Sequence, residues 1–320
     1  MSADLKPGTY TGLKMEAYLA LPAVSASLVK AIVNECPRAA WWDSWLNPAR
    51  VVSTSDAMDT GTIAHSILLE GSASGVEVID PEDHPAEKTG AIPTGWTNKS
   101  IKLARDAARE AGKIPVLKDD FAAIEAMVAS ARDFITSCKA NEPAVFEAFK
   151  PSCGESELTM IWQDGDTLCK MRPDRISKDR KLIIDYKTSA RSVEPDSWGR
   201  TQMVGMGYYL SAAWYRRGVE ALCGVSPAYV FLAQEVEPPY LCSLVGVDPH
   251  AFELGAQKIE HGLNAWRACV RTGKWPAYPS RVCYPEIPAW EDSRWEERQA
   301  QEFMAQPVKD PARTYGELQI

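Results

Sequence analysis

The hydrophobic and polar positions in the first half of the chain predict helices. Apolar residues recur at helical spacing in VSASLVKAIVNEC (24–36), where Pro37 stops or bends the helix, and again in GTIAHSILLEG (61–71). Prolines and glycines predict a loop over 75–100. Beyond this loop a long helical region is expected from about 100 to 148, with a break near GKIPVLKDD.

The second half of the chain predicts strands. ELTMIW, QDGD and TLCKMRPDRIS form a hairpin with Asp-Gly as its tight turn, and KDRK leads into a third strand, LIIDYKTSA. A helix is expected from about 196 to 217, two further strands over 227–247, and a helix from 249 onward. This order predicts an α/β fold, in which helices flank a central mixed β-sheet and the N-terminal part is helical.

The same order indicates one integrated domain followed by a tail. Residues 1–150 form the helical N-terminal part, 151–283 the core sheet with its helices, and 284–320 a polar C-terminal tail. No apolar stretch approaches the roughly 20 residues that cross a bilayer, and the first residues lack the apolar core of a secretory signal. A cytoplasmic protein without a membrane partner is therefore expected.

Charge and cysteine content limit the candidate chemistry. The formal net charge of −8 argues against a nucleic-acid partner if the charge is spread evenly. However, residues 170–200 carry nine Lys and Arg against five Asp and Glu, a net +4, which permits a phosphate ligand there. The eight cysteines include no CxxC pair, so an iron–sulfur cluster is not expected.

Charged residues directly follow the apolar run of the third predicted strand. Asp185 and Lys187 lie two positions apart and point to the same face. Asp174 ends the neighbouring strand, and Glu157 on the first strand can face the same side. Carboxylates of this kind hold Mg²⁺, and a lysine beside them can orient a water and stabilise charge on a phosphate. The alternative is an ordinary salt bridge between Asp185 and Lys187.

Several segments resemble the PD-(D/E)xK nuclease superfamily, and in particular its RecB-like and exonuclease VIII (RecE-like) branch in phages and prophages. The resemblance covers SASLVKAIVNECPRAAWW, GTIAHSILLEG, ESELTMIW, CKMRPDRI, IIDYKTSA, GYYLSAAWYRRGVEAL and GKWPAYP, in this order. It implies the PD-(D/E)xK nuclease fold and a metal-dependent hydrolase acting on DNA, with Mg²⁺ as cofactor and Mn²⁺ able to replace it.

The resemblance also assigns a role to each matching residue. The metal ligands would be His65, Asp174, Asp185 and the backbone carbonyl of Tyr186. The catalytic residues would be Lys187, Asp185, Asp174, Glu157 and Tyr215.

Some of these positions have a structural interpretation as well. His65 lies among apolar residues, which is also typical of a hydrogen-bonded core histidine. Glu155 is an alternative to Glu157 as the acidic site residue of the first strand. Three basic residues are expected on a solvated rim that DNA phosphates would pass: Arg172, Arg175 and Lys178.

Ser211 departs from the pattern of the superfamily. Members usually carry Gln four residues before the helix tyrosine, on the same helix face, and Ser211 stands there in this chain. Gln202 cannot replace that residue on a continuous helix, because nine residues place it on nearly the opposite side. Ser211 is counted among the residues that contact DNA.

By resemblance, the expected activity is a 5′-to-3′ exonuclease that acts on double-stranded DNA ends in phage-type recombination. A homo-oligomer is expected, because members of this kind form rings that thread DNA, and a single-strand annealing protein is the expected partner. The alternatives are a structure-specific or restriction-type endonuclease, and a non-catalytic DNA-binding protein on a decayed nuclease fold.

Overall fold

The computed structural model describes residues 6–50 and 56–305 of the chain. Contacts divide the chain into two compact units, residues 1–277 and 278–320. The predicted division of the first unit near residue 150 stays a prediction.

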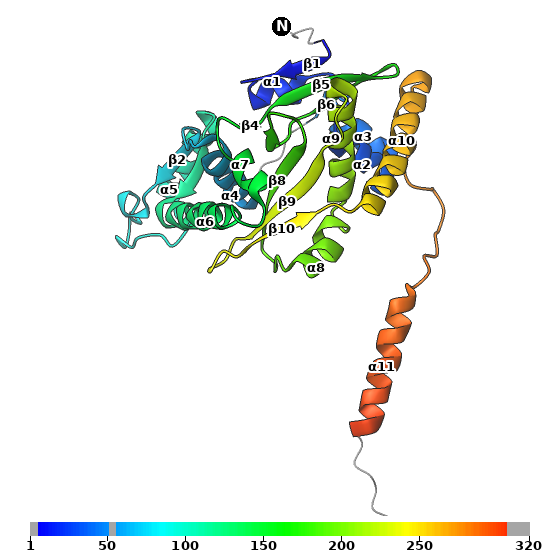
Figure 1. The fold of residues 1–320 in the computed structure, drawn as a ribbon. Coiled ribbons are helices and arrows are strands. Elements are labelled where there is room, and N and C mark those ends of the chain that lie inside the picture. The colour runs from blue at the N-terminus through cyan, green and yellow to red at the C-terminus, as the bar shows by residue number, and fades with distance from the viewer. Residues whose placement is uncertain (1–5, 51–55, 306–320) are drawn as a thin grey trace, which may run out of the picture. The chain divides into compact units, whose positions relative to one another are not determined.

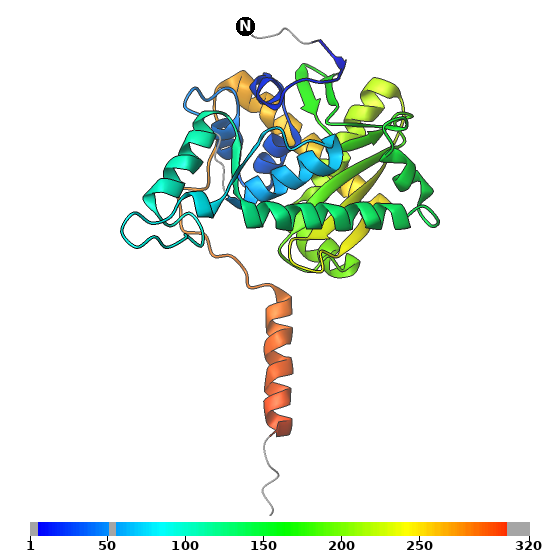
Figure 2. The same ribbon diagram turned by 90° about the vertical axis from the view of Figure 1, so that its left-hand side faces the viewer.

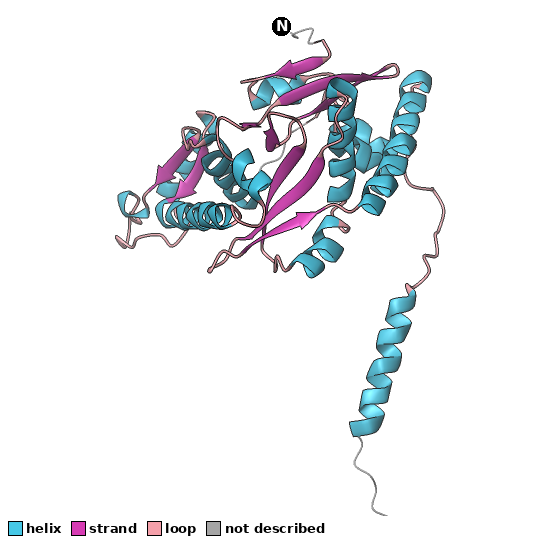
Figure 3. Cartoon of the chain, in the orientation of Figure 1, coloured by secondary structure: helices cyan, strands magenta, loops and turns pink. Residues whose placement is uncertain are grey.

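Helices and strands alternate along the first unit (Figure 3). The α-helices are α1 (Met15–Ala20), α2 (Ala26–Asn34), α3 (Pro37–Asp43), α4 (Asp56–His65), α5 (Lys99–Glu110), α6 (Lys118–Ser137), α7 (Pro143–Ala148), α8 (Pro195–Trp198), α9 (Tyr208–Cys223) and α10 (Pro249–Thr272). The strands are β1 (Gly8–Tyr10), β2 (Val76–Ile79), β3 (Ile114–Leu117), β4 (Gly154–Ser156), β5 (Thr159–Asp164), β6 (Thr167–Met171), β7 (Arg175–Ser177), β8 (Leu182–Ser189), β9 (Ala228–Glu235) and β10 (Cys242–Gly246).

A five-stranded mixed sheet in the order β10-β9-β8-β7-β4 forms the centre of this unit. β8 and β9 are parallel, which requires a crossover connection, and α8 and α9 supply it. The other neighbours are antiparallel. α2, α9 and α10 cover one face of the sheet and α4, α6 and α7 the other (Figure 1). Figure 2 views the molecule from the side of α6. The predicted α/β fold is confirmed.

Strand β8 is buried on both faces, with a different core on each. Ile183 packs in the core beneath α2, α9 and α10. Ile184 and Tyr186 pack in the core beneath α4 and α6. Because side chains alternate along a strand, Asp185 and Lys187 share the face of Ile183. The two charged residues therefore lie on the α9 side of the sheet.

The predicted hairpin is present but passes from one sheet to another. β5 and β6 pair next to β1 in a three-stranded sheet, whereas the adjoining β4 and β7 belong to the five-stranded sheet. The change occurs at Glu157, whose φ of 51° is left-handed. The Glu157 N–H donates a hydrogen bond of 3.2 Å to the carbonyl of Asp174 on the opposite segment. The bend brings two of the predicted site residues, Glu157 and Asp174, together at the joint between the two sheets.

One expectation about the region 75–148 was wrong, because strand β2 lies in the predicted loop. β3 lies at the predicted break near GKIPVLKDD and pairs in parallel with β2. Pro115 cannot donate the hydrogen bond that a helix interior needs, so a short apolar run around it suits an edge strand better than a helix. The helical periodicity belongs to α5 and α6, on either side of this strand.

The single helix predicted over 196–217 is also wrong. α8 continues into a π-helical turn (Gly199–Met203), the chain then turns, and α9 begins only at Tyr208. Gly207 has a φ of 64°, which glycine adopts without the steric cost of a side chain. Gln202 and Ser211 therefore do not lie on one continuous helix, and helical periodicity does not place Gln202 on the opposite side from Ser211.

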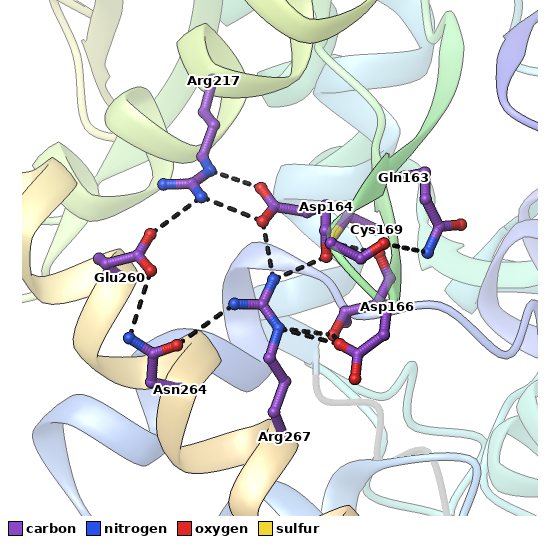
Figure 4. Close-up of polar contacts among 10 residues, drawn as sticks. Gln163, Asp164, Asp166, Cys169, Arg217, Glu260, Asn264 and Arg267 are labelled. Atoms are coloured by element: carbon purple, nitrogen blue, oxygen red, sulfur yellow. Dashed lines mark hydrogen bonds and ion pairs between the residues drawn. The ribbon is translucent and has the colours of Figure 1, made fainter.

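An ionic cluster fixes the β5–β6 turn to two helices (Figure 4). Arg217 of α9 donates two hydrogen bonds to the Asp164 carboxylate, at 2.6 and 3.0 Å. Arg267 of α10 donates to the same carboxylate at 2.8 Å and to the Asp164 carbonyl at 2.6 Å. Burial alone would raise the pKa of Asp164, but the two guanidinium groups outweigh it and hold this pKa below its usual range.

We expect this cluster to make stability depend on pH in the acid range. A carboxylate with a depressed pKa stabilises the fold above its unfolded pKa of about 3.9, and this stabilisation is lost as pH falls through the folded pKa. Asp164→Asn should therefore lower the free energy of unfolding by about 2 kcal/mol at pH 7. Urea unfolding of both proteins should show the difference shrinking towards pH 3. A difference independent of pH would contradict this assignment.

The second unit contains α11 (Ala289–Ala305). Arg294 pairs with Glu291 and Arg298 with Glu302 along this helix. Across the part of the chain that the structure describes, no helix has the length and apolar character to cross a membrane.

Candidate active site

A cleft of about 1150 Å³ contains most of the charged residues that the sequence singled out. Its lining comes from the segment around α1, the end of α4, the hairpin joint, β8 and the start of α9. Among the lining residues are His65, Glu157, Arg172, Asp174, Tyr186, Lys187 and Tyr215. Segments more than 100 residues apart in the chain thus meet at one place.

His65, the last residue of α4, approaches both carboxylates of the hairpin joint. Its Nε2 lies 3.1 Å from Asp174 Oδ2 and 2.9 Å from the carbonyl oxygen of Tyr186. Its Nδ1 lies 3.9 Å from Glu157 Oε1. His65 is therefore not an isolated core histidine, because both ring nitrogens face polar groups of the cleft.

Asp185 and Lys187 form an ion pair beside this group. Lys187 Nζ lies 2.8 Å from Asp185 Oδ2 and 4.0 Å from Asp174 Oδ2. The Tyr186 N–H donates to Asp174 Oδ2 at 2.8 Å, which fixes this carboxylate against β8. Asp185 is only 5% exposed, so its charge sits deeper than that of Asp174. The expected pairing of these residues on one strand face is observed.

The two aspartates have pKa values shifted in opposite directions. Burial would raise the pKa of Asp174, but His65 and Lys187 beside it lower this pKa well below its usual range. Burial and the negative charge of Asp174 raise the pKa of Asp185 to about 7. Two buried carboxyls side by side resist carrying two charges, and the one with more cationic neighbours ionises first.

The pKa values of the groups around the two aspartates are shifted by the same two causes, burial and neighbouring charge. Burial would lower the pKa of His65, but the charge of Asp174 and its hydrogen bond raise it to about 9. Burial would also lower the pKa of Lys187, and Asp185 and Asp174 more than offset this and raise it above its usual range. Burial and Asp174 raise the pKa of Glu157, with Arg172 acting in the opposite direction.

The expected solvated rim is wrong for two of its three residues. Arg172, with 11% of its side chain exposed, donates to the Glu157 carboxylate and to the carbonyl of Leu13 at 2.6 Å. Arg175 is 7% exposed, and its guanidinium donates to three acceptors inside the protein. Both guanidinium groups form hydrogen bonds inside the protein, because carbonyl, carboxylate and hydroxyl oxygens of neighbouring segments lie within hydrogen-bond distance. Lys178 is exposed, as expected of a rim residue.

The remaining predicted residues lie on α9 and β4. Tyr215 lines the cleft, and its hydroxyl donates to the carbonyl of Arg172 at 3.3 Å. Ser211 lines a neighbouring cavity instead. Glu155 pairs with Arg180, so Glu157 is the acidic residue that reaches the cleft.

Two aromatic residues of the cleft were missed. Tyr18 lines it from α1, and no motif in the sequence pointed to that segment. Tyr208 lines it from α9, and the ammonium of Lys187 lies 5.6 Å from the centre of its ring. Tyr208 lies at helical spacing with other aromatic residues, a pattern typical of a core face, and only its position at the start of α9 indicates the mouth of a site.

The donor set fits a divalent metal ion. Ligand atoms of His65, Glu157 and Asp174 all lie within 4.8 Å of one another. Carboxylate oxygens suit Mg²⁺ and Mn²⁺, and one imidazole nitrogen can complete such a set. Asp185 is not part of this group, because its carboxylate contacts Lys187. Glu157 thus joins the candidate ligands, and Asp185 and the Tyr186 carbonyl as metal ligands stay predictions.

The fold and the cleft are those of a PDDEXK-like domain. Residues 25–285 match the model of the family described as PDDEXK-like domain of unknown function (DUF3799), and the chain belongs to this family.

Similarity to solved structures extends over most of the chain. A protein from Eubacterium rectale, described as a candidate exonuclease, is similar with a TM-score of 0.54 and 14% identity, over 89% of this chain and 99% of that one. An alkaline exonuclease from Laribacter hongkongensis shows 13% identity over 65% of this chain and 89% of that one, with a TM-score of only 0.21. No curated protein matches the chain.

Proposed function

We propose that the protein is a metal-dependent deoxyribonuclease that hydrolyses phosphodiester bonds in the cleft around His65, Asp174 and Lys187. The supporting observation is the meeting of an imidazole, three carboxylates and a lysine at the joint between two sheets. Membership of the PDDEXK-like family supports the same chemistry.

Each residue then has a defined task. Asp174, Glu157 and His65 would hold the metal ion, most simply Mg²⁺ with Mn²⁺ able to replace it, which supplies positive charge to the phosphate and acidifies a bound water. Lys187, held by Asp185, lies where it can orient the attacking water and stabilise charge on the phosphate oxygens. Arg172 keeps the Glu157 carboxylate in place.

We propose an exonuclease that degrades double-stranded DNA from its ends, 5′ to 3′. This finer assignment rests on the resemblance to exonuclease VIII-like proteins. A homo-oligomer, a single-strand annealing protein as partner and a cytoplasmic location belong to the same proposal. The similar Eubacterium rectale protein is itself described as a candidate exonuclease.

Digestion of linear and closed-circular duplex DNA tests this function. With Mg²⁺ the linear form should disappear and the closed circle should remain, and EDTA should stop the reaction. Strands labelled at the 5′ or the 3′ end then give the polarity. Cutting of the circle would favour the endonuclease alternative instead. If neither form is cut with Mg²⁺ or Mn²⁺, the proposed activity is rejected and the non-catalytic alternative is favoured.

A further inference from the structure

The backbone of Tyr186 contacts two of the three side chains that form the candidate metal site. Its N–H donates to Asp174 Oδ2 at 2.8 Å, and its carbonyl oxygen lies 2.9 Å from His65 Nε2. The ladder between β7 and β8 ends with the pair Arg175 and Ile184, so side chains rather than a strand meet Tyr186 on this side. The position of the Tyr186 backbone therefore affects where Asp174 and His65 stand relative to each other.

The side chain of Tyr186 is anchored by Gln234 in the core beneath α4 and α6. Both residues are buried, with 1% and 0% of their surfaces exposed. The Tyr186 hydroxyl donates to Gln234 Oε1 at 2.5 Å. Gln234 Nε2 donates to the carbonyls of Met127 in α6 at 2.7 Å and of Tyr240 at 3.3 Å. Because carbonyl oxygens only accept, they fix the amide with its nitrogen towards them and its oxygen towards the phenol.

Gln234 reaches Tyr186 across the parallel strands β8 and β9. Tyr186 pairs with Leu232 and Thr188 with Gln234, so Gln234 lies diagonally opposite Tyr186 on the same face of the sheet. The Tyr186 ring also lies beside the His65 ring, with centres 5.2 Å apart and planes inclined at 39°. A shift of the Tyr186 ring would therefore disturb His65 directly, as well as through the backbone.

The surroundings of this hydrogen bond are apolar. Val128, Ile184 and Leu232 belong to the same core. A polar pair in such a core costs free energy unless its donors and acceptors are satisfied, and a satisfied pair makes the core more rigid. An apolar residue at position 234 could fill the space, but it would not fix the direction of the tyrosine hydroxyl.

We propose that Gln234 is a positioning residue of the candidate metal site. Acting through the Tyr186 hydroxyl, it holds the Tyr186 backbone where it contacts Asp174 and His65, and it thereby raises the affinity of the site for a divalent metal ion. This inference rests on the proposed function. Residues that orient metal ligands without touching the metal change metal affinity by about 10- to 100-fold when they are replaced.

Three variants separate positioning from stability. Tyr186→Phe leaves the Gln234 amide oxygen unsatisfied, and Gln234→Met leaves the Tyr186 hydroxyl unsatisfied, so each should lower the midpoint of urea unfolding. The double variant replaces both partners by apolar groups and should recover most of this midpoint. The two carbonyls that lose Gln234 keep other donors, because Met127 lies inside α6 and Tyr240 accepts from Ser130 Oγ at 3.1 Å.

The test is Mn²⁺ binding to the full chain without DNA, measured by electron paramagnetic resonance. The wild type should bind, and all three variants should bind at least about tenfold more weakly. Tyr209→Phe is the matched control, because Tyr209 is a buried tyrosine outside the cleft lining whose hydroxyl accepts from Lys258 at 2.6 Å. Its affinity for Mn²⁺ should stay within about twofold of the wild type.

The double variant distinguishes the two possible roles of Gln234. A recovered unfolding midpoint with Mn²⁺ affinity still about tenfold below the wild type supports the positioning role. Recovery of both the midpoint and the affinity would show that Gln234 serves stability alone, and would overturn the inference while the proposed function stands. No Mn²⁺ binding by the wild type would instead reject the metal site of the proposed function, and this inference with it.

Discussion

Replacing Lys187 by alanine is expected to lower the rate of DNA cleavage at least about 1000-fold, because removal of one charge-stabilising donor alone costs about 100- to 1000-fold and water orientation is lost as well. The fold should persist, since burial and Asp174 already favour the protonated form of Asp185 by raising its pKa. Initial rates on a linear duplex with Mg²⁺, together with circular dichroism, measure both effects.

Asp185→Asn and Lys139→Ala complete this experiment. Asp185→Asn removes the carboxylate that holds Lys187 and should also abolish cleavage. Lys139 is exposed near the end of α6, and its replacement should leave the rate within about twofold of the wild type. Near wild-type turnover by Lys187→Ala or Asp185→Asn would show that the cleft is not the catalytic site.

The second large effect is expected on stability, from Arg175→Met. The Arg175 guanidinium donates to the carbonyls of Ala148 at 2.6 Å and Lys150 at 2.9 Å, and to Ser156 Oγ at 2.8 Å. Methionine fills a similar volume but leaves these acceptors unsatisfied, and each unsatisfied buried group costs about 1–3 kcal/mol. The free energy of unfolding should fall by about 3 to 4 kcal/mol in total.

Guanidinium chloride unfolding measures this change through the midpoint concentration. Lys178→Met is the control, because Lys178 lies one residue beyond the same strand and is exposed. Its effect should stay within about 0.5 kcal/mol. A loss below 1 kcal/mol in Arg175→Met would mean that water satisfies the three acceptors equally well, and that Arg175 is free for another task.

Local patterns were sufficient to predict the part of the site that lies on one strand. The period of two along β8 places Asp185 and Lys187 on one face, and the apolar run before them predicts that the strand is buried. The order of elements likewise predicts the mixed sheet between helices. These features depend on short stretches of sequence, which hydrophobic periodicity describes well.

Features that depend on contacts between distant segments could not be predicted. The left-handed backbone of Glu157 decides that the hairpin joins two sheets, and nothing in ESELTMIW indicates it. Arg172 and Arg175 looked like surface residues, because their acceptors are backbone carbonyls that sequence patterns do not reveal. The parallel pairing of β2 with β3 joins segments separated by a loop and α5.

The segment around β1 and α1 is part of the wall of the cleft, although it lies far in the chain from Asp174 and Lys187. β1 pairs with β5, and the carbonyl of Leu13 accepts a hydrogen bond from the guanidinium that holds Glu157. Affinity tags and reporter groups are therefore poorly placed just ahead of Gly8, where they would disturb the strand that leads into this wall. Attachment beyond residue 277 adds to a separate compact unit and is the better choice for measurements on the cleft.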